Sequence, residues 1–369
     1  MQQGEGPQSV AAFFISSSIE LRAEPGDLFI TLLSVFLCVL LLQAALQLLC
    51  VWLDGRRFRP PGTLVKLAGR TVHVQQLGRG VPAIVLEAGI AASSLSWSVL
   101  QPQLAALAAT YSYDRAGLGW STATSRKCRV SRMAEDLHRW IDAMQVPRPY
   151  VLAGHSYAAY ILRMYTQRFP DEVAGVVLID PLTPEEWIKP SGPQRWQIRR
   201  AVWFSRAGAV LGALGVIRFC LWLLQRGNNA APRRVLGSFG ANAKDTVERI
   251  LGELAKLPPE TVRLIRERWC RPKFLLTMAR YIQTLPACAA EISGCDIPAH
   301  IPVTVISGAH QPRVRMAEHK AIAARSAHGR HLVAANSAHW IHLDQPELIV
   351  EAFRAMVEEM KAEGIPASH

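Results

Sequence analysis

The chain has 369 residues, of which half are apolar and 19% are charged, and its formal net charge is +12. This composition suits one large domain with an insertion, or two domains, and argues against disorder over most of the length. A basic balance is compatible with nucleic acid or an anionic membrane, but no basic motif interleaved with aromatic residues is present, so nucleic-acid binding is not expected.

The first predicted element is an apolar stretch at residues 28–53 that contains no charged side chain. Its 26 residues exceed the roughly 20 that a helix needs to cross a bilayer, so we expect a transmembrane helix after an N-terminal tail at 1–27. The alternative is a buried core helix, but such helices are usually shorter and have a polar face. A cleaved signal peptide fits poorly, because Glu20, Glu24 and Asp27 stand where basic residues should be.

The charges that flank this stretch predict its orientation. Arg22 is the one basic residue before it, whereas Arg56, Arg57, Arg59, Lys66 and Arg70 follow it. Because cytoplasmic flanks carry an excess of Lys and Arg, we expect a single-pass anchor with the following domain on the cytosolic side.

Short apolar strands alternate with helices in the next part of the chain. We expect a hairpin from strands at 64–68 and 70–77, further strands at 81–89, 110–114, 149–154 and 172–180, and helices at 95–109, 131–145 and 157–169. Strands that are apolar throughout suit a mostly parallel sheet with helices on both faces, which is an α/β fold.

The alternation stops after residue 181 and later resumes. It continues with a strand at 302–308, a helix at 315–327, a strand at 331–336 and a last helix from about 345 to 362. We therefore expect a core made of residues 63–181 and 301–362, with residues 182–300 inserted after the sixth strand.

Three chemistry-bearing side chains stand where predicted strands end. Ser156 follows the fifth strand, Asp180 ends the sixth, and His339 follows the last. Functional groups collect at the carboxyl ends of strands in an open parallel sheet, so we expect these three residues to lie close together.

This arrangement resembles the α/β-hydrolase superfamily. The resemblance covers residues 63–181 and 301–362, and it rests on EAGIAASSLSW, YDRAGLGWS, GHSYA, VLIDP and SAHWIHLDQPE. It implies a serine hydrolase with a twisted, mostly parallel sheet and a helical cap inserted after the sixth strand. Neither a metal nor an organic cofactor is implied.

The resemblance assigns a nucleophile and a base. Ser156 is the candidate nucleophile on a strained turn between strand and helix, although Ala158 replaces the last Gly of the GxSxG pattern. A serine that only caps the following helix is the alternative. His339 is the candidate base, because neutral imidazole accepts the Ser proton and returns it to the leaving group, with His342 as the substitute.

The candidate acid is Asp180, which would orient His339. Many relatives place the acid after the seventh strand, where the first carboxylate here is Glu318, inside a predicted helix. Asp180 could instead be structural. Asp344 is expected to cap the last helix, and Asp296 lies at the opposite end of the sheet.

An oxyanion hole needs two backbone N–H groups aimed at the developing charge. By resemblance these belong to Ile90 and Tyr157, whereas Asp114 and Arg115 look like residues that order a loop. Serine at position 156 also argues against the dehalogenases and epoxide hydrolases of this fold, which use Asp there.

The insertion is strongly basic, with 18 Lys and Arg against 9 Asp and Glu. Its segment 207–224 is apolar except for Arg218 and long enough to span a membrane, but one crossing there would separate the sixth and seventh strands. We expect a cap helix that contacts membrane lipid, or one that is simply buried against the core.

These observations together predict a membrane-anchored serine hydrolase that cleaves a lipophilic carboxylic ester, similar to an esterase or lipase. An amidase, a peptidase or a carbon–carbon bond hydrolase of the same fold remains an alternative, as does a non-catalytic binding protein. The seven cysteines are scattered without a CxxC pair, so no zinc site is expected, and only Cys288 and Cys295 are considered as a disulfide pair.

Overall fold

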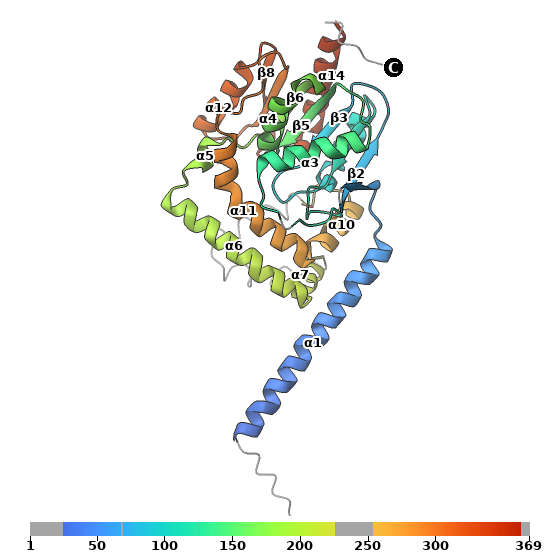
Figure 1. Cartoon of the computed structure of the whole chain (residues 1–369), viewed down its shortest axis with the longest axis vertical. Coiled ribbons are helices and arrows are strands. Elements are labelled where there is room, and N and C mark those ends of the chain that lie inside the picture. Colours follow the sequence, from blue (N-terminus) through green and yellow to red (C-terminus); the bar gives the residue numbers. More distant parts are fainter. Residues whose placement is uncertain (1–24, 68, 125, 226–253, 363–369) are drawn as a thin grey trace, which may run out of the picture.

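The computed structural model describes residues 25–67, 69–124, 126–225 and 254–362. Its centre is an eight-stranded sheet in the order β1-β2-β4-β3-β5-β6-β7-β8 (Figure 1). β2 pairs antiparallel with both β1 and β4, and all other neighbours are parallel. The strands are β1 (Thr63–Leu67), β2 (Arg70–Leu77), β3 (Ile84–Glu87), β4 (Thr110–Tyr113), β5 (Tyr150–His155), β6 (Val173–Ile179), β7 (Val303–Gly308) and β8 (Gly329–Ala334).

Helices cover both faces of this sheet, which explains strands that are apolar at every position. One face carries α3 (Val130–Ala143), α4 (Ala158–Arg168) and α12 (Arg313–Ala324), and the other carries α2 (Gln101–Ala105) and α14 (Pro346–Ala362). Successive residues of β5 point to opposite sides, since Leu152 belongs to the core cluster of α3 and Val151 to that of α14. The sheet is therefore fixed from both sides by burial.

The expected helix at 95–109 is wrong as a single element. The chain instead forms a short 3₁₀ helix, η1 (Ser94–Trp97), and then α2, which begins next to Pro102. Proline has no backbone N–H and is accommodated in the first turn of a helix, so it starts a new helix here rather than continuing the previous one. The other predicted strands and helices of the core are present with small shifts of their ends.

The described part of the chain between β6 and β7 is helical. It forms α5 (Glu185–Ile188), α6 (Gly192–Ala213), α7 (Val216–Gln225), α10 (Pro259–Trp269) and α11 (Pro272–Ile292), and α6 packs along α11. The apolar segment 207–224 is not one straight helix, because α6 and α7 meet at Gly215, which has a φ of +77°, with a bend of 92°. Glycine permits this left-handed conformation without a Cβ clash.

Helix α1 (Pro25–Arg57) extends away from the rest of the molecule (Figure 1). It is long and apolar enough to cross a membrane, and its most apolar window has no buried residue. Its C-terminal part docks on the cap helices, where the Arg218 guanidinium of α7 lies 2.6 Å from the Asp54 carboxylate. Arg218 also donates to the side-chain oxygen of Gln47 at 2.8 Å, and Gln47 itself is 4% exposed.

Candidate active site

Ser156 occupies the turn between β5 and α4 in a left-handed conformation, with a φ of +57°. Such a φ is strained for a residue with a Cβ and persists only where neighbours enforce it. The Ser156 N–H donates to the Ile179 carbonyl of β6 at 3.0 Å, which fixes the turn against the sheet. A Cβ on Gly154 would lie 2.8 Å from the Cβ of Ala158, so Gly154 supplies the space that accommodates alanine in the last position of the pattern.

Asp180 and His339 meet at the same edge of the sheet. The Asp180 Oδ2 lies 2.6 Å from the His339 Nδ1, and the Asp180 Oδ1 accepts the Gly308 N–H at 3.1 Å. Asp180 is 2% exposed and has a φ of +42°, whereas the His339 side chain is 35% exposed. A buried carboxylate thus holds one ring nitrogen of an imidazole that remains open to its surroundings.

Gln311 is a part of this site that sequence reasoning missed. Its side-chain amide donates to Asp180 Oδ2 at 2.6 Å, the same oxygen that His339 contacts. Arg315 of α12 in turn donates to the Gln311 side-chain oxygen at 2.9 Å and to both carboxylate oxygens of Glu186 at 2.7 Å. Only its position in the sequence could have indicated this role, because Gln311 lies in the loop after β7, at the sheet edge where the candidate residues gather.

Glu318, the first carboxylate after the seventh strand, makes no hydrogen bond or ion pair with His339 among the described residues. Its carboxylate accepts the hydroxyl of Thr183 at 2.6 Å. Asp344 does not cap the last helix, as the sequence had suggested, but ends the short helix α13 (Ile341–Asp344). It accepts the Ser337 hydroxyl at 2.8 Å and pairs with Lys256, two partners that the sequence pattern does not reveal.

His342, the substitute base, is buried. In the described part of the chain neither of its ring nitrogens has a hydrogen-bond partner, and it contacts Trp97 at a ring separation of 4.9 Å. Burial, followed by the nearby His339, lowers the pKa of His342 to about 3. A histidine that stays neutral and touches no carboxylate is poorly placed to shuttle a proton.

His155 ends β5 directly before Ser156 and contacts the candidate base His339. Its Nε2–H donates to the His339 carbonyl at 2.8 Å, and the two imidazole rings are 4.5 Å apart. Burial, with the adjacent His339 and His342, holds the pKa of His155 well below its usual value. Among the described residues, no hydrogen bond joins the Ser156 hydroxyl to His339, and such contacts often tighten only when substrate is bound.

The backbone N–H groups of Ile90 and Tyr157 have no hydrogen-bond partner among the described residues. Tyr157 directly precedes α4, so its N–H is one of the unpaired donors at a helix N-terminus. The loop that carries Ile90 is fixed by hydrogen bonds, because the Arg115 guanidinium donates to the carbonyls of Ala88 and Gly89. Both N–H groups are therefore unengaged, and that of Tyr157 directly follows Ser156 in the chain.

Asp114 and Arg115 order loops and touch none of the three candidate catalytic side chains. Asp114 accepts the backbone N–H of Ser94 at 2.8 Å and that of Trp120 at 2.9 Å, whereas Arg115 pairs with buried Glu87. All seven cysteines, including Cys288 and Cys295, are free thiols. No cluster of three or more potential metal ligands occurs within the described ranges.

Comparison with known proteins agrees with this geometry. Residues 82–201 match the family described as having the alpha/beta hydrolase fold. An "AB hydrolase superfamily protein" of Gibberella zeae is 35% identical over 103 residues, which cover 27% of this chain and 32% of the relative. The human (Lyso)-N-acylphosphatidylethanolamine lipase is 26% identical over 152 residues, covering 39% of this chain and 38% of the relative. The matches thus span less than half of these curated relatives.

A solved structure extends the likeness over most of the fold. The thermophilic esterase from Thermogutta terrifontis has a TM-score of 0.52 and 17% sequence identity, and the match covers 80% of this chain and 97% of the esterase. At this identity the likeness concerns the fold alone. The sheet order, the cap position and the strained turn define an α/β-hydrolase fold. The chain therefore has the α/β-hydrolase fold, and its residues 82–201 are similar in sequence to the family of that name.

Proposed function

We propose that this protein is a membrane-anchored serine hydrolase that cleaves a carboxylic ester. The observation that carries the proposal is the 2.6 Å contact between Asp180 and His339, made at the sheet edge where strained Ser156 turns into α4. The acid and base of the proposed triad are thereby in contact, and this supports Ser156, at the end of the neighbouring strand, as their nucleophile.

The reaction begins when the Ser156 hydroxyl attacks the ester carbonyl and His339 accepts its proton. Because Asp180 occupies Nδ1, the proton goes to Nε2 of His339. The oxyanion receives the N–H groups of Ile90 and Tyr157, and protonated His339 then releases the alcohol by returning the proton. Water activated by the same imidazole cleaves the acyl-enzyme, and the 35% exposure of the His339 side chain leaves room for its approach.

A lipophilic substrate is favoured by the outer face of α6. Trp196, Trp203 and Val210 are 57–62% exposed and seven residues apart, so they share one side of the helix. Exposed Arg199 and Arg206 lie among them. A helix that exposes aromatic and basic side chains together is typical of contact with an anionic membrane surface.

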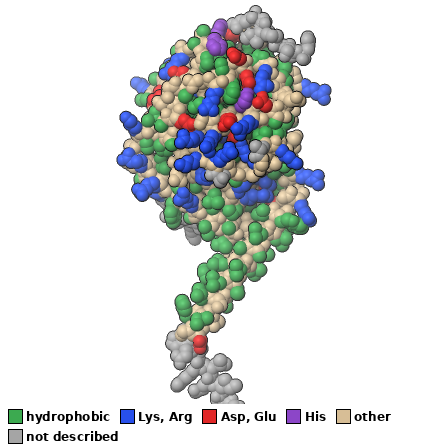
Figure 2. Space-filling model, viewed as in Figure 1, with side chains coloured by type: hydrophobic (Ala, Val, Ile, Leu, Met, Phe, Trp, Pro, Cys, Tyr) green, Lys and Arg blue, Asp and Glu red, His purple; other side chains and the backbone are tan. Residues whose placement is uncertain are grey.

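The cap also contacts the proposed anchor. α7 contacts α1 through Arg218 and Asp54, and Phe219, the next residue of α7, is 58% exposed. Figure 2 shows apolar side chains over the visible length of α1 and Lys and Arg side chains on the adjoining body. The human relative is named as a lipase of (lyso)-N-acylphosphatidylethanolamine, which is compatible with an ester taken from a bilayer. The basic flank of the anchor favours a cytosolic catalytic domain.

Labelling with a fluorophosphonate probe tests the nucleophile. The wild-type protein should label, and Ser156→Ala should not. Ser205→Ala is the matched control, because this cap serine only donates to the Ala201 carbonyl and should leave labelling intact. Labelling that survives Ser156→Ala contradicts the proposal, and absence of labelling in the wild type favours a non-catalytic binding protein.

The acid is tested with Asp180→Asn and a matched control, Glu318→Gln. Asp180→Asn should lower kcat on a short-chain ester by about 10³- to 10⁴-fold, since the imidazole loses its orienting carboxylate. Glu318→Gln removes the negative charge but keeps an oxygen that can accept the Thr183 hydroxyl, so it should stay close to wild type. The reverse result would make Glu318 the acid. Matched amide and carbon–carbon substrates in the same assay distinguish the alternative activities.

A further inference from the structure

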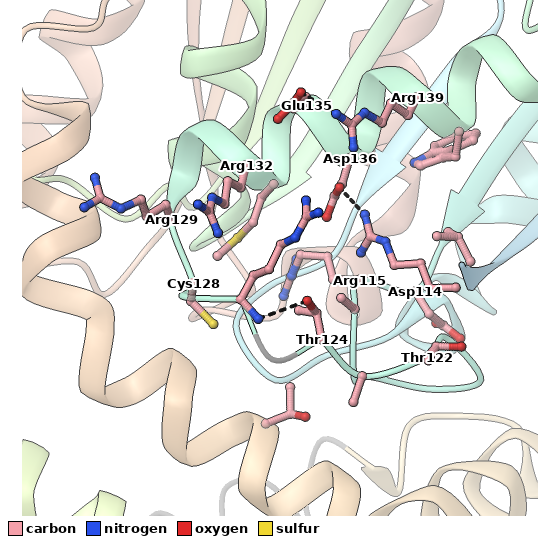
Figure 3. Close-up of a pocket in the computed structure, with 18 of the residues that line it drawn as sticks. Asp114, Arg115, Thr122, Thr124, Cys128, Arg129, Arg132, Glu135, Asp136 and Arg139 are labelled. Atoms are coloured by element: carbon pink, nitrogen blue, oxygen red, sulfur yellow. Dashed lines mark hydrogen bonds and ion pairs between the residues drawn. The ribbon is translucent and has the colours of Figure 1, made fainter. Parts of the chain in front are cut away.

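A cavity of about 280 Å³ lies outside the candidate active site. Its walls come from β2, the loop between β4 and α3, α3 itself and α11 (Figure 3). Ser156, Asp180 and His339 are not among its lining residues. The proposed hydrolase reaction therefore does not account for it.

The lining of this cavity is strongly basic. Eight Arg and Lys side chains contribute to it, against three carboxylates. The carboxylates already have partners. Asp136 pairs with Arg70, and Glu135 pairs with Arg139 at 2.6 Å. Asp114 accepts hydrogen bonds from backbone N–H groups of neighbouring loops. The acidic groups present thus leave most of the positive charge in the lining uncompensated.

Five of the basic lining residues make no ion pair within the described ranges: Arg126, Lys127, Arg129, Arg132 and Arg280. In Figure 3, Arg132 lies between α3 and Cys128, whereas Arg129 points away from the cavity. Arg280 of α11 closes the other side and donates only to neutral carbonyls, those of Thr124 and Arg126. Figure 2 shows Lys and Arg side chains gathered across the middle of this face.

Like charges that converge on a concave wall raise the local concentration of counter-ions. Guanidinium groups bind phosphoryl oxygens by two parallel hydrogen bonds, which suits them to this class of anion. The N-terminus of α3 does not supply anion-binding groups, because Glu291 already accepts the backbone N–H groups of Val130 and Ser131 at 2.9 and 3.1 Å. The side chains supply the binding groups.

We propose that this cavity binds a phosphoryl group through Arg126, Arg132 and Arg280, at a site separate from the candidate active site. Its volume corresponds to about nine water molecules, which admits a phosphate with a small organic substituent. The same chemistry is presented by a soluble phosphate ester and by a phospholipid headgroup. The proposal does not depend on the hydrolase activity.

Ligand binding here would also join core and cap. Arg280 belongs to the cap helix α11, whereas Arg126 and Arg132 belong to the core. An anion shared by these residues binds only the folded protein, so it should raise the unfolding temperature in a concentration-dependent way.

The test uses the full-length protein in a neutral detergent and compares it with two double variants of equal charge change. R126Q/R132Q alters the cavity, and R313Q/K320Q alters two exposed basic residues of α12 as a control. Inorganic phosphate is titrated against chloride at constant ionic strength, with the unfolding temperature as readout. Binding to phosphatidylcholine vesicles with and without phosphatidic acid is measured by flotation.

A phosphate-dependent rise in unfolding temperature that weakens at least tenfold in apparent Kd in R126Q/R132Q, but not in the control, supports a soluble ligand. A selective loss of the phosphatidic-acid effect in R126Q/R132Q supports a lipid headgroup. Chloride matching the phosphate effect, or equal responses of the two variants in both assays, would overturn the proposal. Both variants change exposed side chains and should unfold near the wild-type temperature without ligand.

Discussion

Two hydrogen bonds converge on a single oxygen of Asp180, one from Gln311 and one from His339, each at 2.6 Å. The carboxylate therefore has little freedom to rotate away from the imidazole. Among the hydrogen bonds of the described residues, Gln311 contacts Asp180 and Arg315 but neither Ser156 nor His339. Its role is therefore to position Asp180 rather than to react.

Gln311→Ala should lower kcat on a short-chain ester by about tenfold and leave KM nearly unchanged. The variant loses one hydrogen bond to a charged group, and the acid becomes less well oriented. Steady-state kinetics provide the measurement. Gln103→Ala is a suitable control, because that exposed amide only donates to the Val99 carbonyl. A raised KM with normal kcat would show that Gln311 contacts substrate instead.

The sequence was sufficient to predict that Asp180 and His339 lie close together, because each stands at the carboxyl end of a strand and parallel strands end at one edge. The participation of Ser156 stays a prediction. The sequence was not sufficient for Gln311 or His155. A loop amide has no periodicity, and a buried histidine is indistinguishable in sequence from an exposed one. Their roles depend on where the loops after β7 and β8 bring other atoms.

At the scale of elements, α5 and α12 are linked by the two hydrogen bonds from Arg315 to Glu186. Arg315 also contacts Gln311, so a chain of polar contacts runs from the first cap helix to Asp180. The position of α5, the first helix of the cap, is thereby coupled to the orientation of Asp180, the candidate acid.

Glu186→Gln should lower kcat a few-fold while changing the free energy of unfolding by less than about 1 kcal/mol. Both side chains are about a quarter exposed, and ion pairs of this kind contribute little to stability. Thermal unfolding and kcat on a short-chain ester are compared. Glu185→Gln, next to it on α5, serves as the control. A large fall in stability would assign Glu186 a structural role.

Two helix breaks in the structure are not predicted by the pattern of apolar residues. The apolar segment 207–224 reads as one helix by length, yet Gly215 divides it and the two parts meet at 92°. Pro102 divides residues 95–109 in the same manner. In both places one residue with special backbone geometry decides the outcome, and an average over a window of apolar residues does not register it.

At the scale of the whole molecule, two buried neutral histidines make the fold sensitive to acid. The pKa of His342 is about 3 in the folded protein and about 6.5 in an unfolded chain. The unfolded state therefore binds more protons between these values, and stability is lost as pH falls from about 6.5 toward 3. The lowered pKa of His155 acts in the same direction.

His342→Phe should reduce this loss of stability between pH 7 and pH 4.5, because phenylalanine fills the site beside Trp97 without needing a proton. Urea unfolding of the full-length protein at the two pH values measures the difference. His300→Phe, which changes an exposed histidine, should retain the wild-type pH dependence. Equal pH dependence in all three proteins would refute the explanation.

Membrane contact by the cap predicts a difference between two kinds of substrate. Replacing exposed Trp203 and Phe219 by Gln should lower turnover of a long-chain ester in anionic vesicles several-fold and leave turnover of a soluble short-chain ester unchanged. Val314→Gln, at a 71% exposed position of α12, is the control. Parallel losses on both substrates would contradict the proposed contact.

The docking of α1 on the cap, through Asp54, Gln47 and Arg218, has a kinetic consequence. A domain attached by a single flexible linker tumbles, and its entrance faces the bilayer only part of the time. In the proposed membrane-bound arrangement, the contacts between α1 and the cap would instead restrict the domain to fewer orientations on the surface. Its rate would then follow the number of substrate molecules per unit area of membrane, and diluting the surrounding solution would leave it unchanged.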